Sequence, residues 1–397
     1  MTRFALTNGQ ILTDDGFRDD LAVIIGGAHI EAVVPAHDLE PGLKVRDLEG
    51  QYLMPGFIDI QVNGGGGVLF NDEPTVEGIA AIGAAHRTYG TTGFLTTLIS
   101  DRLEVVEAGM QATKSAIDAG VPGVLGIHVE GPFLNADKKG IHNASLFRPL
   151  DDEAYAILSL KTGGQTLVTA APEANPLPIV RKLADAGVLV VAGHTDASFD
   201  QAQAGFDAGM CGVTHLFNAM SPLKAREPGM VGAALINDQI WCPVIVDGHH
   251  VHPATLKLAL KLKPRGRLFL VTDAMPSVGL EADHFVLQGR KIHVAEGMCQ
   301  SADGTLAGSD LNMAAAVRNT VSMLGVDLAE AARMAALYPA EFLGLAHEYG
   351  RIAPGYRANL ILSDKFVNVT ESWIDGRDTG CLHQSQQRSM YMPKASQ

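Results

Sequence analysis

The sequence predicts an α/β fold, namely a (β/α)8 TIM barrel with a small β-sandwich domain formed by both termini. Short apolar runs and amphipathic stretches alternate eight times, over about 250 residues, which is the size of such a barrel. Strand-like segments also precede and follow this region, and they predict the sandwich. A doubly wound sheet is the alternative arrangement for the same alternation.

Residues 1–52 are expected to form the N-terminal part of the sandwich. Apolar and β-branched residues gather in short runs that Asn-Gly, Asp-Gly and Gly-Gly turns separate. The expected strands are Phe4–Leu6, Gln10–Leu12, Leu21–Ile25 and Ile30–Val34.

Residues 53–345 are expected to form the barrel. Its predicted strands are Met54–Val62, Thr91–Leu98, Gly123–Val129, Leu167–Ala171, Val188–Ala192, Gly212–His215, Cys242–Val246 and Leu268–Thr272. Helical patterns lie between them, for example at Val76–Tyr89, Leu103–Ala119, Pro178–Ala186 and Ala254–Leu262. After the eighth strand we expect a hairpin over His284–Val294 and helices over Leu311–Leu324 and Leu328–Leu345.

Residues 346–382 are expected to complete the sandwich, and residues 383–397 to form a flexible polar tail. The expected C-terminal strands are Ala358–Leu362, Asn368–Val369 and Ser372–Ile374, with a turn at Asp375–Gly376.

Composition narrows the class of function. The 30 Lys and Arg residues against 44 Asp and Glu residues give a net charge of −14, which argues against a nucleic-acid partner bound through bulk charge. No apolar run approaches a membrane span, and the N-terminus lacks the apolar core of a signal peptide. The four cysteines form no C-x-x-C pair. We therefore expect a cytoplasmic protein without a membrane or nucleic-acid partner.

Polar side chains end almost every predicted barrel strand. Barrel enzymes carry their catalytic groups at the carboxyl ends of the strands. The polar residues at these ends are Gln61 and Asn63, His128 and Glu130, His194 and Asp196, His215, Asp247 with His249 and His250, and Asp273.

Each of these residues also has an ordinary structural interpretation. A single His at a strand end often makes only a structural hydrogen bond, and Asp196 or Asp273 suits the N-cap of the next helix. Gly64–Gly67 lacks the Lys of a phosphate-binding loop. His249 and His250 are adjacent, so both cannot point into one site.

The shared position of four of these residues argues against separate structural roles. Glu130, His194, His215 and Asp273 follow four different strands at the same predicted face. One carboxylate and two imidazoles make a three-ligand site for Zn²⁺ or Fe²⁺ with an open position for water. A metal lowers the pKa of that water and polarises a carbonyl. Asp273 is suited to take the proton from water and pass it to a leaving amine, so the set favours hydrolysis of an amide or ester.

Ordered motifs over nearly the whole chain resemble the amidohydrolase superfamily and, more narrowly, the N-acetylglucosamine-6-phosphate deacetylase family. They are Pro55–Asp59, His128–Phe133, Gly193–Ala197, Thr214–Met220, Asp247–His250, Thr272–Ala274 and Leu306–Ser309. Each motif is weak alone, and the ordered set is specific.

The resemblance implies a role for several residues. It implies Glu130, His194 and His215 as metal ligands, Asp273 as the acid and base, and His142 as the group that polarises the acetyl carbonyl. Further implied substrate contacts are Ile141, Asn218 and Ala219 at the sugar, Leu306, Ala307 and Gly308 closing the site, and Arg226 and His250 at the 6-phosphate. Because the family's Arg reaches across a dimer interface, we expect a homodimer or a higher oligomer that shares Arg226. The alternative for Arg226 is a solvated loop charge.

The first barrel strand departs from the superfamily pattern. That strand usually offers His-x-His to a first metal, whereas this chain has Gln61-Val62-Asn63. Neutral amides are poor ligands for a borderline metal, so we expect one divalent ion per subunit, with a weakly held second ion as the alternative. Gln61 and Asn63 would instead hydrogen-bond the water or the substrate.

The resemblance therefore implies hydrolysis of N-acetylglucosamine 6-phosphate to glucosamine 6-phosphate and acetate, in amino-sugar catabolism or cell-wall recycling. One alternative is a deacetylase of the galactosamine epimer or of another N-acyl sugar phosphate. A catalytically dead barrel that serves as a scaffold is the alternative from another class, and the complete residue set argues against it. A carbohydrate-binding module is disfavoured, because the chain has only 2 Trp and 7 Tyr.

Overall fold

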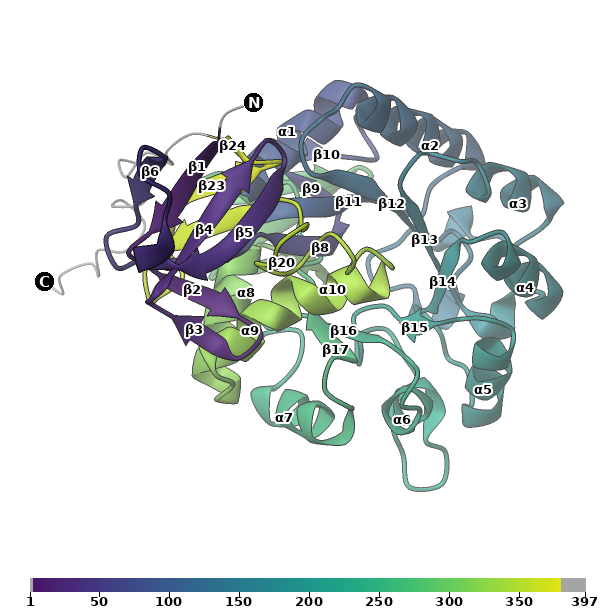
Figure 1. Cartoon of the computed structure of the whole chain (residues 1–397). Coiled ribbons are helices and arrows are strands. Elements are labelled where there is room, and N and C mark those ends of the chain that lie inside the picture. The colour runs from purple at the N-terminus through teal and green to yellow at the C-terminus, as the bar shows by residue number, and fades with distance from the viewer. Residues whose placement is uncertain (1–2, 380–397) are drawn as a thin grey trace, which may run out of the picture. The chain divides into compact units, whose positions relative to one another are not determined.

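A computed structural model describes residues 3–379, and the chain divides into two compact units. Among the described residues, the smaller unit takes residues 3–54 and 352–379, and the larger unit is Pro55–Arg351. Both ends of the chain therefore contribute to one unit, coloured purple and yellow in Figure 1. The tail expected at 383–397 lies outside the described residues.

Two sheets make up the smaller unit. The first has the strand order β5-β4-β1-β6, and the second has the order β24-β23-β22-β7-β2-β3. The strands of the first are β1 (Arg3–Thr7), β4 (Leu21–Gly26), β5 (His29–Pro35) and β6 (Lys44–Asp47). Those of the second are β2 (Gln10–Thr13), β3 (Gly16–Arg18), β7 (Tyr52–Pro55), β22 (Leu360–Ser363), β23 (Val369–Ile374) and β24 (Arg377–Asp378). The second sheet joins strands from both termini, which confirms the predicted fold class.

The two strands expected at Asn368–Val369 and Ser372–Ile374 are one strand, β23. Polar Thr370 and Glu371 stay within it because each has a partner. The Glu371 carboxylate pairs with the guanidinium of Arg46, and the Thr370 hydroxyl donates to Gln51 Oε1 at 3.0 Å. The sequence pattern shows that Thr370 and Glu371 interrupt the apolar run, but it does not show their distant partners.

A buried apolar cluster connects the two sheets. It includes Leu6, Ile25, Leu360 and Trp373, each at most 3% exposed. Leu360→Ala is expected to lower the free energy of unfolding by about 2–5 kcal/mol, because it removes buried methyl groups and leaves a cavity. Chemical denaturation checks this value. Val45→Ala is the control, since Val45 is 50% exposed and a surface change costs less than about 0.5 kcal/mol. Equal losses in the two variants would contradict the prediction.

Eight parallel strands form the barrel within the described residues of the larger unit (Figure 1). They are β8 (Phe57–Val62), β11 (Thr91–Ile99), β12 (Val124–Glu130), β13 (Gln165–Ala170), β14 (Leu189–Ala192), β15 (Gly212–Val213), β16 (Cys242–Val244) and β17 (Leu268–Leu270). Continuous ladders join β8 to β15 and β16 to β17. Single bridges, Gly212 to Trp241 and Val62 to Ala274, close the two remaining gaps. This closure excludes the doubly wound sheet.

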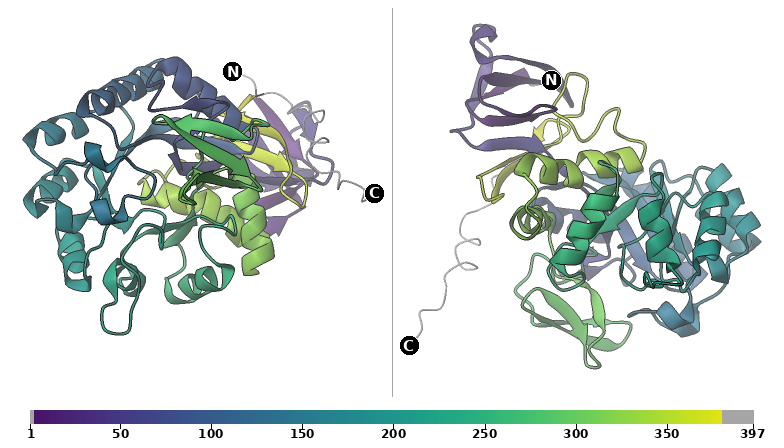
Figure 2. Two further views of the ribbon diagram at one scale, coloured as in Figure 1. Left: turned by 180° about the vertical axis from the view of Figure 1, so that it is seen from behind. Right: turned by 90° about the horizontal axis from the view of Figure 1, so that it is seen from below.

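Helices surround the barrel on the outside (Figures 1 and 2). They are α1 (Val76–Arg87), α2 (Leu103–Asp118), α3 (Asp152–Leu158), α4 (Leu177–Asp185), α5 (Phe199–Asp207), α6 (Gly229–Ile236), α7 (Pro253–Leu262), α8 (Met313–Asn319), α9 (Leu328–Ala335) and α10 (Leu337–Phe342). None of the helices in the described part of the chain is long and apolar enough to cross a membrane.

The single helix expected over Leu328–Leu345 is wrong, because α9 ends at Ala335 and α10 begins at Leu337. Ala336 between them has a non-helical backbone, with φ −129° and ψ −62°. Pro339 explains the break, since proline cannot donate a backbone hydrogen bond and its ring clashes with the carbonyl four residues earlier.

The predicted hairpin after the last barrel strand belongs to a four-stranded antiparallel sheet, shown in green in Figure 2. Its strands are β18 (His284–Leu287), β19 (Arg290–Ala295), β20 (Met298–Ser301) and β21 (Leu306–Ser309). Its buried side chains, including Leu287 and Ile292, form one cluster with Ile99 at the end of β11 and with Ile141. Ser309 bridges to Ala274 beyond β17. The sheet therefore packs at the carboxyl ends of the barrel strands.

Candidate active site

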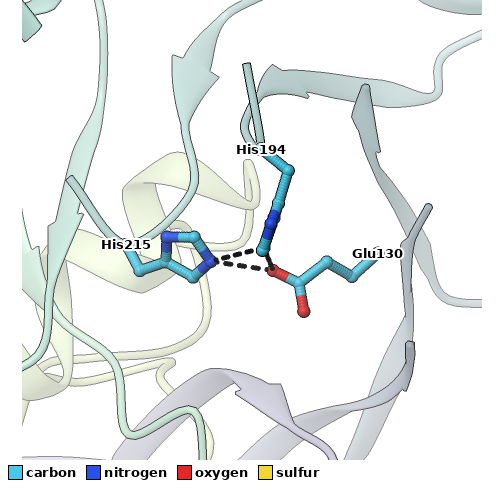
Figure 3. Close-up of side chains that lie close together, drawn as sticks. All are labelled: Glu130, His194 and His215. Carbon is cyan, nitrogen blue, oxygen red and sulfur yellow. Dashed lines mark hydrogen bonds and ion pairs between the residues drawn. The ribbon is translucent and has the colours of Figure 1, made fainter. Parts of the chain in front are cut away.

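Three barrel strands bring Glu130, His194 and His215 together (Figure 3). Glu130 is the last residue of β12, and each His lies two residues beyond the end of its strand, β14 or β15. His215 Nε2 lies 3.0 Å from Glu130 Oε1 and 3.2 Å from His194 Nε2. His194 Nε2 lies 3.5 Å from the same carboxylate oxygen. All three side chains are buried.

The spacing of these three atoms fits a metal ion. Ligands at about 2.0–2.1 Å from a tetrahedral Zn²⁺ lie about 3.3 Å from one another. His194 Nδ1 lies 2.9 Å from the carbonyl oxygen of Lys138 and donates to it, so Nε2 keeps its lone pair for a ligand. Such a second hydrogen bond is how proteins orient a metal-binding imidazole. The donor set therefore fits a site for one divalent metal ion.

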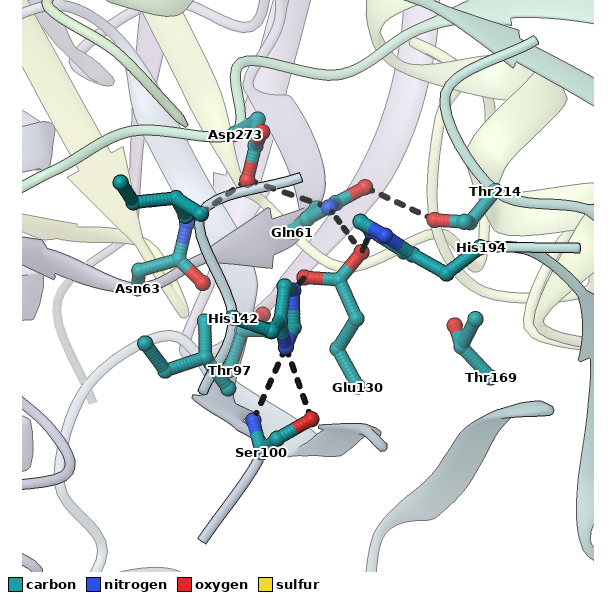
Figure 4. Close-up of polar contacts among 12 residues, drawn as sticks. Gln61, Asn63, Thr97, Ser100, Glu130, His142, Thr169, His194, Thr214 and Asp273 are labelled. Carbon is teal, nitrogen blue, oxygen red and sulfur yellow. Dashed lines mark hydrogen bonds and ion pairs between the residues drawn. The ribbon is translucent and has the colours of Figure 1, made fainter. Parts of the chain in front are cut away.

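Asp273 lies beside this group, beyond the end of β17 (Figure 4). Its Oδ1 accepts hydrogen bonds from Asn63 Nδ2 at 2.7 Å and from Gln61 Nε2 at 3.1 Å. Gln61 Nε2 also lies 3.0 Å from Glu130 Oε1, and its Oε1 accepts from the Thr214 hydroxyl at 3.1 Å. The two amides thus hold a carboxylate that is 9% exposed.

Burial makes Asp273 a stronger base than an ordinary Asp. Loss of solvent and the nearby Glu130 charge raise the pKa of Asp273 to about 6. At pH 7 its carboxylate is mostly ionised, yet it holds a proton more readily than a solvated Asp. This pKa suits a group that first takes and then returns a proton.

His142 approaches the Glu130 carboxylate (Figure 4). Its Nδ1 accepts from the backbone N–H of Ser100 at 3.2 Å. That bond places the proton on Nε2, which lies 3.8 Å from Glu130 Oε2. Burial lowers the pKa of His142 to about 3, so the ring is neutral and offers an N–H to the site.

Three of these residues have left-handed backbone conformations. The φ angles are +46° at His194, +25° at His215 and +54° at Asp273. Non-glycine residues adopt this region at a cost of about 1–3 kcal/mol, and such residues cluster at functional sites. Each follows a barrel strand, so the strained turn redirects its side chain from the end of the strand.

A cavity of about 360 Å³ opens onto these groups. Most sequence-predicted contacts line it, together with the metal-type group and Asp273. The predicted lining residues are Asn63, Ile141, His142, Asn218, Ala219, His250, Leu306 and Gly308. His250 Nδ1 lies 2.5 Å from Asp247 Oδ2. Its neighbour His249 bonds the carbonyl of Glu296 at 3.0 Å instead. The cavity is large enough for a small organic ligand.

A model described as the amidohydrolase family matches residues 52–381. This chain belongs to the amidohydrolase family. A second model, the NagA composite domain, matches residues 3–53.

Curated relatives of this amidohydrolase carry two substrate names. This chain is 40% identical to an N-acetylgalactosamine-6-phosphate deacetylase from Shewanella sp. (strain ANA-3) over 336 residues, and the alignment covers 84% of each chain. It is 35% identical over 378 residues to the N-acetylglucosamine-6-phosphate deacetylase of Haemophilus influenzae, covering 94% of this chain and 99% of that protein.

Solved structures give the same result for the fold. N-acetylglucosamine-6-phosphate deacetylase from Pasteurella multocida matches with a TM-score of 0.92 and 34% identity, covering 95% of this chain and 99% of that one. A mutant of the Mycobacterium smegmatis deacetylase, in complex with N-acetyl-D-glucosamine-6-phosphate, matches with a TM-score of 0.88, 32% identity and coverage of 95% and 99%. The amidohydrolase is thus a deacetylase-type member of its family.

Three predicted substrate contacts do not line the cavity of this amidohydrolase chain. Gln61 is buried and bonds Glu130 and Asp273 instead. Ala307 is fully buried because alternate residues of β21 face opposite sides, so Leu306 and Gly308 reach the cavity and Ala307 does not. Arg226 lies in an exposed loop, outside the lining.

Sequence reasoning missed several residues of the amidohydrolase site. Lys138 lines the cavity, its carbonyl orients His194, and its Nζ lies 3.2 Å from Asp196 Oδ1. The Asp-Lys-Lys-Gly segment before His142 was the available signal. Met275 also lines the cavity, two residues after Asp273. Asp196 and Asp273 are not N-caps, since Ser198 caps α5 and Asp273 bonds the two amides.

Proposed function

We propose that this amidohydrolase hydrolyses the acetamido group of N-acetylglucosamine 6-phosphate, releasing acetate and glucosamine 6-phosphate. One observation carries the proposal: a metal-type group, a buried Asp with a raised pKa and a neutral His lie around one sugar-sized cavity. The names of the relatives support this class of substrate. A scaffold would not need this arrangement.

We propose one divalent ion, Zn²⁺ or Fe²⁺, held by Glu130, His194 and His215. When bound, the ion polarises a carbonyl and lowers the pKa of water. Two imidazoles and one carboxylate suit either metal. The amides of Gln61 and Asn63 donate to Asp273, which supports a positioning role rather than a second metal site.

The proposed reaction uses two side chains of this chain directly. His142 Nε2–H donates to the acetyl carbonyl oxygen, and its Nδ1 is held by Ser100 so that the N–H stays on the reacting side. Asp273 takes a proton as water attacks the carbonyl carbon. It then passes that proton to the departing amine as the C–N bond breaks, so the carboxylate is regenerated.

The proposed phosphate site combines His250 with Arg226 of a second copy. His250 lines the cavity and its Nδ1 lies 2.5 Å from Asp247 Oδ2. Binding an oxyanion there requires a proton on Nε2 as well, because an oxyanion only accepts hydrogen bonds. Arg226 is exposed and outside the cavity lining of its own chain. That position suits an Arg that completes the cavity of the partner in a homodimer.

The galactosamine epimer is the second candidate substrate. The Shewanella relative with that name is 40% identical to this chain, whereas the Haemophilus glucosamine relative is 35% identical. The two substrates share the acetamido group and the phosphate, so both use the same reacting residues. They differ only at one hydroxyl of the sugar ring.

Acetate release by metal-loaded protein tests these proposals. N-acetylglucosamine 6-phosphate, its galactosamine epimer and unphosphorylated N-acetylglucosamine are compared by kcat/KM. We expect the first substrate to be preferred and the unphosphorylated sugar to be much poorer. A preference for the epimer would select the second candidate, and no acetate from any of the three would overturn the proposal.

The acid limb of the rate profile reports Asp273. The pKa of this group is raised to about 6, and the proposed base is the ionised form. We expect kcat at saturating substrate to fall as the pH drops below about 6, approaching tenfold per pH unit. A bound dication moves this midpoint lower, never higher, because it favours the carboxylate. The residual rate of Asp273→Asn should lack this limb, and a persisting limb would contradict the assignment.

A further inference from the structure

Asp59 is a fully buried carboxylate within strand β8. Among the described residues it has hydrogen bonds but no ion pair with a Lys, Arg or His. Its Oδ1 accepts from the backbone N–H of Gln61 at 3.2 Å and of Thr272 at 3.3 Å. Its Oδ2 lies 2.5 Å from the Thr272 hydroxyl. A buried carboxylate without a cation is costly, so its position calls for an explanation.

The location of Asp59 is the seam of the barrel. Strands β8 and β17 are neighbours at the closure, yet no continuous ladder joins them, and Val62 to Ala274 is their bridge. The Asp59 carboxylate accepts the Thr272 N–H, as a backbone carbonyl would do in a ladder. It thereby connects the first and last strands of the barrel where the backbone does not.

Thr272 extends this connection to both sides of Asp273. Its hydroxyl donates to Asp59 and accepts from the backbone N–H of Ala274 at 3.2 Å. Asp273, between them, has the left-handed φ of +54°. On the other side, the Ser309 N–H donates to the carbonyl of Asp273 at 2.9 Å. The strained residue is therefore clamped at its two neighbours.

The Asp59 carboxylate is also linked to Asp273 by a second route, through Gln61. Asp59 accepts the N–H of Gln61, and the Gln61 side chain donates to Asp273 Oδ1. Backbone and side-chain contacts of Asp59 therefore converge on one catalytic carboxylate. Burial raises the pKa of Asp59 itself to about 7, consistent with the absence of a cation beside it in the described part of the chain.

We infer that Asp59 is a positioning residue that, through Thr272, holds the Asp273 carboxylate where proton transfer occurs. This inference rests on the proposed function, in which Asp273 is the base. It predicts that the hydroxyl of Thr272 matters for turnover although it does not line the cavity. A misplacement of a catalytic group by about 1 Å can cost about 100-fold in rate.

Thr272→Val tests the link, and Thr272→Ser is its matched control. Valine keeps the branched shape and removes the hydroxyl that joins Asp59 to Ala274, whereas serine keeps it. We expect Thr272→Val to lower kcat by about 10–100-fold with KM and metal content per subunit little changed. Thr272→Ser should stay within about threefold of the wild type. Equal rates for both variants would overturn the inference.

A double-mutant cycle separates positioning from general support of the fold. Thr272→Val is combined with Asp273→Asn, and the loss of kcat is compared in the two backgrounds. If Thr272 acts through Asp273, the second substitution adds little once the base is gone. An equal loss in both backgrounds would show that the two residues act independently, which would overturn the inference.

Two further measurements complement these: the first does not use a Thr272 variant, and the second does not use activity. Asp59→Asn keeps an oxygen for both backbone N–H groups and should retain more kcat than Asp59→Ala, which leaves them unpaired. A crystal structure of Thr272→Val should show the Asp273 carboxylate displaced from Asn63 Nδ2. An unmoved carboxylate would overturn the inference, whereas an inactive wild type would count against the proposed function alone.

Discussion

Asp273→Asn is expected to lower kcat by about 10²–10⁴-fold, the usual contribution of general acid and base catalysis. The amide has nearly the shape of the carboxylate but cannot take a proton from water. Gln61 and Asn63 both donate to Asp273 Oδ1, and the amide oxygen can accept the same bonds. We therefore expect folding, metal content and KM to change little.

Steady-state acetate release, metal analysis and thermal unfolding together check this result. Asp283→Asn is the control, because Asp283 is exposed and lies beside the hairpin rather than the cavity. A rate within about threefold of the wild type in Asp273→Asn would remove Asp273 from the mechanism. Loss of metal in that variant would instead indicate a direct role as a ligand.

Glu130→Gln is expected to have the second large effect, through the metal. Glu130 is the anionic member of the three-residue group, and its carboxylate lies within 3.5 Å of both imidazoles. A neutral amide oxygen is a much poorer ligand. Mutation of a residue that only hydrogen-bonds to a metal ligand already costs about 10–100-fold in metal affinity or activity. We therefore expect Glu130→Gln to lower metal affinity by more than about 100-fold.

Elemental analysis of the purified variant, with activity measured before and after metal addition, checks this loss. Glu281→Gln is the matched control, since Glu281 is exposed. Chelation should inactivate the wild type in the same way, and added Zn²⁺ or Fe²⁺ should restore its activity. Stoichiometric metal and full activity in Glu130→Gln would contradict the assigned ligand set.

The strand-end argument succeeded because parallel strands carry direction in the sequence. Glu130, His194, His215 and Asp273 each follow an apolar run, so barrel closure alone brings them to one face. The sequence alone does not exclude a doubly wound sheet, because closure of the barrel depends on two single bridges, Val62 to Ala274 and Gly212 to Trp241. Two isolated pairs leave no periodic pattern in the sequence.

The finer contacts were missed for a different reason. Gln61 and Asn63 hold a carboxylate more than 200 residues later in the chain, and side-chain rotamers decide such bonds. Lys138 acts on His194 through its carbonyl, a group that every residue possesses. Residue type therefore carries no signal for it. The break at Ala336 was visible in principle, because Pro339 lies in the expected helix.

The left-handed turns at His194, His215 and Asp273 place a requirement of the reaction in conflict with the stability of the fold. Each turn holds a residue with a Cβ where glycine would sit with less strain. Substitutions that abolish turnover at these positions can therefore make the folded chain more resistant to heat. Selection for robustness alone would erode the site, and the three side chains persist only while their reaction is needed.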